Sequence, residues 1–318
     1  MSNTTHVFRQ LSFNISNSDS EAKEHNLALD RIDLSLLIFI ATLLPVTLIA
    51  NGFVIAAIWK NLSLRTPSYI LLAGLAFTDF CTGLISQPLW LANEFLQHLA
   101  SNQLNPSDKS KWPKAFSITT FIGEGCAKYF YQITVLLITL MSIERWLHMT
   151  RRSVLTARRV SYIFVMLSLL MLPLLVFPTE RGSNFVMILL VPCCLIVTSV
   201  AYFKVFRIIR RHQLRIQANA MSQNHVQPAI NFVKYKRSVF TILIILGVFY
   251  ITYLPVIMTI SLLWFLLQNP NLKELMLHVS ILLGYLASSL NPLIVLWRMK
   301  DIRNEVVTLL KGMFCKSS

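Results

Sequence analysis

The stretch YQITVLLITLMSIERW (residues 131–146) decides the fold class of this chain. An apolar run from Tyr131 to Ile143 ends in an acid, a base and an aromatic ring, Glu144, Arg145 and Trp146. A charged side chain at membrane depth costs roughly 3 kcal/mol or more unless it is paired, solvated or able to reach the interface. If this run crosses a membrane, the triplet marks a functional site at its end, so the other apolar runs come next.

Seven apolar segments are long enough to cross a bilayer. Of the 318 residues, 55% are hydrophobic and 14% are charged, whereas soluble domains carry about 25% charged residues. A spanning helix needs about 20 mostly apolar residues. The segments that meet this requirement are Ile32–Trp59, Ser68–Leu96, Phe116–Leu147, Val160–Phe177, Phe185–Ile209, Val239–Leu267 and Leu275–Trp297. The sequence therefore predicts an all-α integral membrane protein, with an N-terminal segment 1–31, a seven-helix bundle 32–299 and a tail 300–318.

Basic residues indicate which side of the membrane faces the cytosol. Lys and Arg concentrate after the first, third and fifth segments and in the tail, most densely between Arg207 and Arg237, while acids precede the first span. Because short loops rich in Lys and Arg stay in the cytosol, we expect the N-terminus outside a cell membrane and the tail inside. The net charge of +15 then indicates contact with anionic lipid and a cytosolic partner, not with nucleic acid.

Two modification signals lie on the outer side. Asn3 and Asn14 begin Asn-X-Thr/Ser triplets in the N-terminal segment, so we expect both to carry glycans. The five cysteines lie in or beside spans or in the tail, and they predict neither a disulfide framework nor a metal site. No nucleophile–base pair can be placed either, so we do not expect an enzyme.

The tail predicts a short amphipathic helix on the inner leaflet. Apolar residues recur there at helical spacing, and the opposite face is polar. The apolar residues are Ile302, Val306, Leu309, Leu310 and Met313. Cys315 follows, where an S-acyl (palmitoyl) anchor and a free thiol are both open interpretations.

Asp79 lies inside the second segment, in LAFTDF (residues 75–80). Intramembrane acids face the bundle interior or a water-filled cavity and are functional by default. Two interpretations remain open: a protonated acid satisfied by helix-to-helix hydrogen bonds, or a hydrated cation or proton site. Polar residues expected at similar depth are Asn51, Thr134, Ser288, Ser289 and Asn291.

Prolines interrupt the sixth and seventh segments. Pro255 and Pro292 each remove a backbone hydrogen bond and kink a helix. Neighbouring polar groups must then satisfy the freed carbonyls, and Thr252, Tyr253 and Asn291 stand beside the two prolines. Two such kinks above a basic rim favour hinges for rigid-body movement, which is typical of a switching bundle.

Together these motifs resemble the rhodopsin-like (class A) G-protein-coupled receptors, over nearly the whole chain. The resemblance implies a coupling site for a heterotrimeric G protein, and for arrestin, and a polar core that can hold a sodium ion. The matching coupling and activation positions are Glu144, Arg145, Trp146, Tyr202, Phe249, Tyr253, Pro255, Asn291 and Pro292. The matching polar-core positions are Asn51, Asp79, Thr134, Ser288 and Asn291.

Several departures from the family's usual motifs narrow the resemblance to one group of receptors. Trp146, Tyr253 and Val295 replace the family's usual Tyr, Trp and Tyr. The cysteine that usually tops the third span is replaced by Thr119 or Thr120, and the second outer loop is expected to be only about residues 179–184, without cysteine. A short second outer loop without a disulfide to the third span is similar to that of the melanocortin, cannabinoid, lysophospholipid and adenosine receptor group.

The resemblance also limits the chemical class of the extracellular ligand. Ala127 stands where amine receptors carry an aspartate, and Tyr285 where opsins carry the retinal lysine, so neither an amine nor retinal is expected. Glu124 and Lys128 are one turn apart, and either they pair with each other or one of them meets a polar ligand group. The expected pocket residues are Glu94, Glu124, Lys128, Tyr129, Gln132, Trp264, His278 and Tyr285.

By this resemblance, an agonist moves the sixth span outward about Pro255, and Arg145 leaves Glu144 to receive the G protein. The acid that usually holds this arginine from the sixth span is replaced by Tyr235, so we expect raised basal activity. A ligand-independent receptor, or a decoy or scaffold, stays open because of the three replaced motif residues. A transporter is disfavoured because no internal repeat is present.

Overall fold

The computed structural model of this chain describes residues 34–103, 114–150, 155–176, 180–222, 244, 247–248, 250–255, 258 and 270–315. The predictions on Asn3, Asn14, Tyr235, Phe249 and Trp264 lie outside these residues, and the side chain of Cys315 is not described either.

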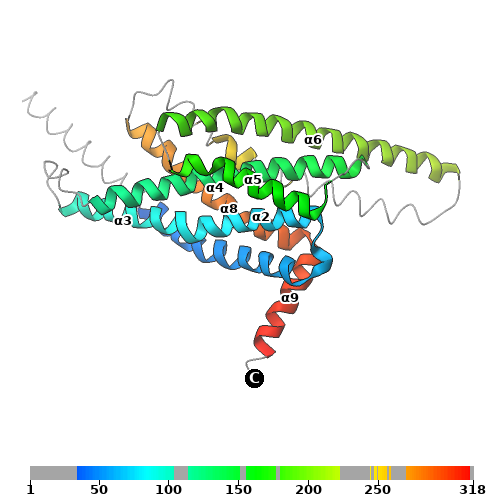
Figure 1. The fold of residues 1–318 in the computed structure, drawn as a ribbon, viewed down its shortest axis with the longest axis horizontal. Coiled ribbons are helices and arrows are strands. Elements are labelled where there is room, and N and C mark those ends of the chain that lie inside the picture. The colour runs from blue at the N-terminus through cyan, green and yellow to red at the C-terminus, as the bar shows by residue number, and fades with distance from the viewer. Residues whose placement is uncertain are drawn as a thin grey trace, which may run out of the picture.

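The described part of the chain is a bundle of long helices without a β-strand (Figure 1). Short helical pieces at 250–255 belong to the predicted sixth span. The helices in chain order are Leu34–Lys60, η1 (Leu62–Leu64), α2 (Pro67–Cys81), η2 (Thr82–Ser86), α3 (Gln87–Gln103), α4 (Lys114–Met149), α5 (Ala157–Val176), α6 (Glu180–Ser222), α8 (Pro270–Arg298) and α9 (Lys300–Cys315).

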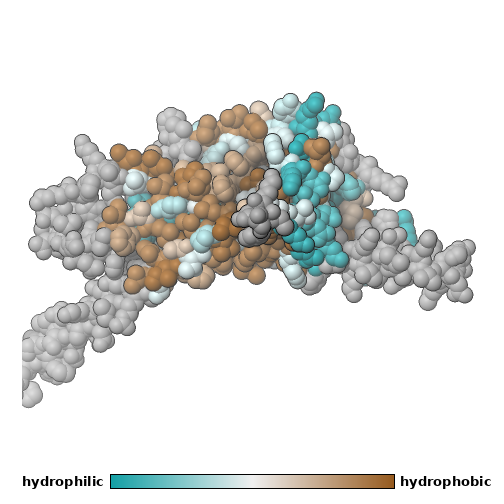
Figure 2. Space-filling model, turned by 90° about the horizontal axis from the view of Figure 1, so that it is seen from below, coloured by the Kyte–Doolittle hydropathy of each residue, from teal (hydrophilic) through white to brown (hydrophobic). Residues whose placement is uncertain are grey.

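Five of these described helices are long and apolar enough to cross a membrane: Leu34–Lys60, Pro67–Leu96, Phe121–Met149, Ile188–Arg211 and His278–Arg298. α5 lies where the fourth span was expected. Figure 2 shows a mostly hydrophobic surface, with hydrophilic residues gathered at the end of the bundle where α9 begins. The predicted class of a helical membrane bundle is confirmed.

The predicted second span differs in detail, because a π-helical turn, η2, joins α2 to α3. A Cβ added at Gly83 would lie 3.0 Å from the Thr47 side chain of the first helix, so a larger residue would require Thr47 to shift by a few tenths of an ångström. π-turns inside helices are frequent at functional sites. The turn shifts the side chains of α3 relative to a regular helix, which no apolar pattern could reveal.

The second outer loop was predicted wrongly. Residues 180–184, expected in that loop, form the first turn of α6. α6 has 43 residues and is therefore about 65 Å long, which is about twice the hydrocarbon thickness of a bilayer. Its C-terminal turns extend beyond the other helices (Figure 1).

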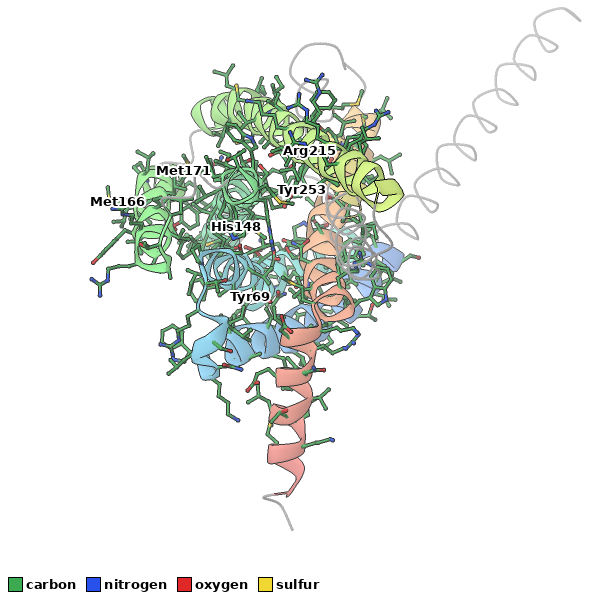
Figure 3. The ribbon with its side chains drawn as sticks, turned by 90° about the vertical axis from the view of Figure 1, so that its right-hand side faces the viewer. Tyr69, His148, Met166, Met171, Arg215 and Tyr253 are labelled. Atoms are coloured by element: carbon green, nitrogen blue, oxygen red, sulfur yellow. The ribbon has the colours of Figure 1, made fainter. Side chains whose placement is uncertain are left out.

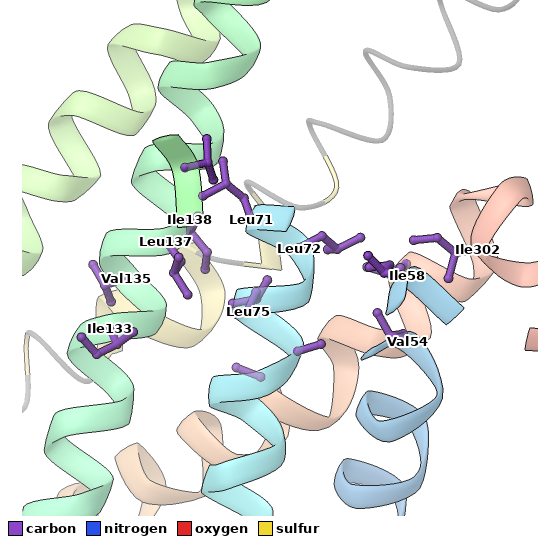
Figure 4. Packing of buried hydrophobic residues seen from close by; sticks show 14 of the residues in the cluster. Val54, Ile58, Leu71, Leu72, Leu75, Ile133, Val135, Leu137, Ile138 and Ile302 are labelled. Atoms are coloured by element: carbon purple, nitrogen blue, oxygen red, sulfur yellow. The ribbon is translucent and has the colours of Figure 1, made fainter. Parts of the chain in front are cut away.

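α4 is the central helix, and it packs against α2, α3, α5 and α6. In Figure 4, Leu71 and Leu75 of α2 lie near Leu137 and Ile138 of α4, in one buried cluster. Lipid tails are as apolar as these side chains, so close packing and interhelical hydrogen bonds hold such helices together.

The tail forms the predicted amphipathic helix, α9, but its apolar residues differ in burial. Ile302 and Val306 are buried in the same cluster as Val54 and Ile58 of the first helix, whereas Met313 is 63% exposed. The first turns of α9 are therefore docked on the bundle (Figure 4), and only its distal half offers an apolar face to its surroundings.

Candidate functional site

The triplet at the foot of α4 is held from two sides. Glu144 is 2% exposed, and its Oε2 accepts a hydrogen bond of 2.8 Å from Ser68 Oγ of α2. The Trp146 ring lies beneath Lys204 of α6, whose Nζ is 4.2 Å from the ring centroid. The two residues that flank Arg145 thus join α4 to α2 and to α6.

The expected pairing of Glu144 with Arg145 is not formed. No ion pair within 4.0 Å joins Arg145 to an acid of the described chain, and Glu144 is bonded to Ser68 instead. Consecutive side chains on a helix point about 100° apart, so Glu144 turns to α2 while Arg145 lies on another face. Arg145 acts electrostatically on Tyr202 of α6, which is buried near it.

Two acids of α9 also accept hydrogen bonds from neutral donors. Tyr69 Oη of α2 donates to Asp301 Oδ2 at 3.0 Å, and Asn61 Nδ2 donates to Glu305 Oε2 at 3.1 Å. Both contacts fasten α9 to the start of α2 and to η1. Figure 3 shows this end of the bundle, with Tyr69 on one side and Arg215 of α6 on the other.

A buried polar core joins the first helix, α2 and α8. Asn291 Nδ2 donates to Asp79 Oδ2 at 2.9 Å. Asn51 Nδ2 donates to the Ser288 carbonyl at 3.1 Å, and Thr47 and Ser289 hydroxyls lie 2.7 Å apart. Thr134 reaches this region from α4 through the hydroxyl of Thr78, at 3.2 Å. The structure thus brings together the polar residues that were expected at one depth.

Two oxygens of this core lack a hydrogen-bond partner. Asp79 is fully buried, and its Oδ1 and the Oδ1 of Asn51 have no partner among the described residues. An unpaired buried acceptor costs about 1–3 kcal/mol. Carboxylate and amide oxygens are ligands for hard cations, so this donor set fits a sodium ion or ordered water.

Two tyrosine rings and a small cavity lie next to the polar core. The rings of Tyr131 in α4 and Tyr253 in the sixth span have centroids 4.7 Å apart. A cavity of about 40 Å³ lies beside Tyr253 and is also lined by Tyr202, Asn291 and Val295. One water needs about 10–15 Å³, so a few waters fit. The lining comes from α2, α4, α6, α8 and the sixth-span residues.

Aromatic and charged residues of α3 and α8 meet at the outer half. Tyr285 Oη donates to the Ser86 carbonyl of η2 at 3.3 Å, and Trp90 contacts both Tyr285 and His278 edge to face. His278 Nε2 lies 3.8 Å from Glu94 Oε1. Three of the expected pocket residues therefore share one site, and Ser86 and Trp90 join them.

The other expected pocket residues are on α4. Lys128 Nζ lies 3.4 Å from Glu124 Oε2, so of the two open interpretations the pairing within the chain is present. Gln132 is fully buried, and neither atom of its amide has a partner among the residues described. Tyr129 Oη donates to the Ser168 carbonyl of α5 at 3.0 Å, which places this hydroxyl in the α4–α5 contact.

Sequence reasoning missed Ser68, Ser86, Trp90 and Lys204. Lys204 had a detectable signal, because it is a cation next to Tyr202 and Phe203 inside a segment predicted to cross the membrane. Ser68 and Trp90 had none, since their roles depend on which helix faces them.

Comparison with known families agrees with this architecture. The model of the seven-transmembrane receptors of the rhodopsin family matches residues 50–105 and 178–294, more than half of the chain. No curated protein matches the chain. The chain belongs to the rhodopsin family of seven-transmembrane receptors.

Proposed function

We propose that this receptor transmits the binding of an extracellular ligand to a cytoplasmic heterotrimeric G protein through outward movement of the sixth helix. In this proposal the chain crosses the plasma membrane seven times, with the N-terminus outside and α9 on the cytoplasmic leaflet. Arrestin binds the same inner surface.

One observation carries the proposal. The cavity lined by Tyr202, Tyr253 and Asn291 lies where several helices meet, between the polar core and Arg145. A close-packed core resists gradual deformation, whereas an unfilled space lets side chains adopt a second arrangement. Transmission between two sites requires such a two-state element, whose equilibrium both ligands bias.

The outer end of this path supports a ligand site. Trp90, His278 and Tyr285 meet there, and Tyr285 is one helical turn from Ser289, whose Oγ donates to the Tyr285 carbonyl. Ser289 in turn contacts Thr47 next to the polar core. A ligand that moves Tyr285 would therefore act on the helix that carries Asn291.

A sodium ion is the cofactor that the polar core fits. The ion would lie against Asp79 Oδ1 and Asn51 Oδ1, the two unpartnered oxygens, and would supply a positive charge there. Added Na⁺, compared with the larger organic cation N-methylglucamine, should raise the melting temperature of the purified receptor. Asp79→Asn, which keeps an acceptor for Asn291, should remove that difference.

The modifications are proposals with direct tests. Glycans on Asn3 and Asn14 should disappear from the intact mass when each is changed to Gln. Palmitate on Cys315 should be lost in Cys315→Ser, as measured by acyl exchange at the thiol.

The central test is a second-messenger panel in cells that express the chain without added ligand. Arg145→Ala should remove any basal signal, because Arg145 is the residue proposed to contact the C-terminal helix of the G protein. Arg210→Ala, an exposed arginine on α6, is the matched control at equal surface expression. Basal signalling that survives in Arg145→Ala would contradict the proposal; in a receptor without basal signal, the same pair of variants is tested on the first agonist of a ligand screen.

A second candidate, ligand-independent signalling, is favoured by one observation. Glu144 is bonded to Ser68, and Arg145 has no acidic partner within the described residues. An arginine without a partner costs less to move, so the resting state is weakly restrained. A high basal signal that no compound raises further would favour this candidate over the first.

A further inference from the structure

Four exposed cations form a line along one face of α6. Helical geometry places residues three and seven apart within a 60° arc, so Lys204, Arg207 and Arg211 face one way, and Arg215 continues the line. All four side chains are exposed. We call Lys204, Arg207 and Arg211 the α6 cationic stripe.

The described part of the chain offers no acid to this stripe. None of its three cations forms an ion pair within 4.0 Å there. The described acids at this end of the bundle are Glu144, Asp301 and Glu305, and each accepts a hydrogen bond from a neutral group. The stripe therefore keeps its full positive charge and fits an anionic partner.

Two aromatic rings lie under the stripe. Lys204 Nζ is 4.2 Å from the Trp146 ring centroid, and the guanidinium carbon of Arg207 is 5.2 Å from that of Phe203. Each ring contacts one side of its cation, and both cationic side chains remain exposed. Trp residues are enriched at the boundary between lipid and water, which is where a headgroup phosphate lies.

The position of the stripe favours lipid over protein. The apolar span of α6 is Ile188–Arg211, so the stripe occupies its last two turns, directly below lipid-exposed side chains such as Val200 and Phe203. Seven residues rise about 10 Å, whereas the headgroup layer of one leaflet is only about 5–8 Å thick. A headgroup with further phosphates presents anionic oxygens over more of that depth than a single phosphodiester does.

We propose that the α6 cationic stripe, with Trp146 beneath it, binds an inner-leaflet phospholipid that has a multiply phosphorylated headgroup. Arg207 and Arg211 present forked donors that match phosphate oxygens, and Lys204 neutralises the phosphate nearest the acyl chains. This inference rests on the proposed cytoplasmic position of this end of α6, but not on signalling.

The test counts lipids bound to the full chain by native mass spectrometry. The receptor is placed in nanodiscs of phosphatidylcholine with a few per cent phosphatidylinositol bisphosphate, or with phosphatidylserine at equal total charge. One surface cation contributes about fivefold to the binding of an anionic membrane. We expect Arg207→Gln or Arg211→Gln to weaken bisphosphate binding about fivefold, and the triple variant with Lys204→Gln about a hundredfold.

Two controls separate the stripe from general charge. Arg210 lies about 90° round α6 from the centre of the stripe, and Arg158 is an exposed cation at the start of α5. Arg210→Gln and Arg158→Gln should each change binding by less than twofold. Lys204→Arg should restore the affinity lost in Lys204→Gln, and unchanged melting temperatures exclude misfolding.

Three results would overturn the proposal. They are equal loss in Arg210→Gln, equal binding of phosphatidylserine, and full lipid retention by the triple variant together with lost G-protein coupling. The last result would assign the stripe to an acidic protein partner. Because lipid counting needs no signal, a receptor that proves silent in every second-messenger assay leaves this test unaffected.

Discussion

Among the described residues, two pairs of oppositely ionisable side chains meet at the outer half of the bundle, whereas the described acids of the inner end are bonded to neutral groups. At the outer half, Lys128 lies 3.4 Å from Glu124 and His278 lies 3.8 Å from Glu94. At the inner end the acids are hydrogen-bonded to neutral groups, as Glu144 is to Ser68. The Lys128–Glu124 pair therefore offsets its own charge, whereas the described chain places no acid within 4.0 Å of the α6 cationic stripe.

This difference indicates what each end requires. A pair of opposite charges near the surface is stabilised by only about 0.2–1 kcal/mol, so a ligand group can open it at low cost. An array of cations without acids repels itself until an anion arrives. The inner end thus favours binding of an anionic surface, such as a lipid headgroup layer or an acidic partner protein.

The largest expected effect concerns Asp79, the acid that lies between the two ends. Asp79→Ala removes the acceptor of the 2.9 Å bond from Asn291 and leaves a buried amide donor unpaired. We expect a loss of about 1–3 kcal/mol in the free energy of unfolding, which thermal unfolding of the purified receptor would show as a fall of several degrees.

Asp79→Asn is the matched control, since it keeps an oxygen that can accept from Asn291 and should retain most of the stability. If Ala and Asn variants melt together, the Asp79–Asn291 bond does not stabilise the core. The buried acid would then be as loosely held as the pairs of the outer half.

A smaller effect is expected from Ser68→Ala, which frees Glu144. A carboxylate that is 2% exposed would lose its hydrogen-bond donor, and the neighbouring Arg145 is the nearest cation along the chain. Once Ser68 no longer holds Glu144 toward α2, both long side chains can swing toward each other, and an ion pair formed there would restrain Arg145. We expect basal second-messenger output to fall about fivefold.

The control for this variant is Ser161→Ala, an exposed serine whose hydroxyl donates to the Ala157 carbonyl of its own helix. Glu144→Gln should leave basal output within about twofold, because the amide still accepts from Ser68. A large rise in Glu144→Gln would show that Glu144 does restrain Arg145, and would contradict the contrast between the two ends.

The helices could be predicted from the sequence, but several side-chain partners could not. Long apolar segments require helices in lipid, because every backbone group must be bonded internally, and residues at one depth, such as Asp79 and Asn291, then meet across the core. By contrast, adjacency in sequence misled for Glu144 and Arg145, since neighbours on a helix point apart. The partner of Trp146 depends on the rotation of α6 about its axis, which hydropathy does not determine.

A weaker effect is expected from Tyr235→Glu, which adds the acid that the sixth span lacks. By the family resemblance, an acid there can pair with Arg145, so basal output should fall about two- to threefold. Tyr235→Gln changes the side chain without adding charge and should leave the output unchanged. A fall of the same size in both variants would show that loss of the tyrosine, not gain of the acid, lowers activity.

The smallest effect belongs to the outer pair itself. Glu124 is 60% exposed and Lys128 26%, and exposed pairs at this spacing contribute about 0.3–0.5 kcal/mol. A double-mutant cycle with Glu124→Gln and Lys128→Gln should give a coupling of that size, which shrinks in 1 M salt as screening shortens the reach of each charge. A coupling well above 1 kcal/mol would mean that the pair is desolvated. A ligand group could then no longer separate the two charges at low cost, and the outer half would be the more tightly restrained end of the receptor.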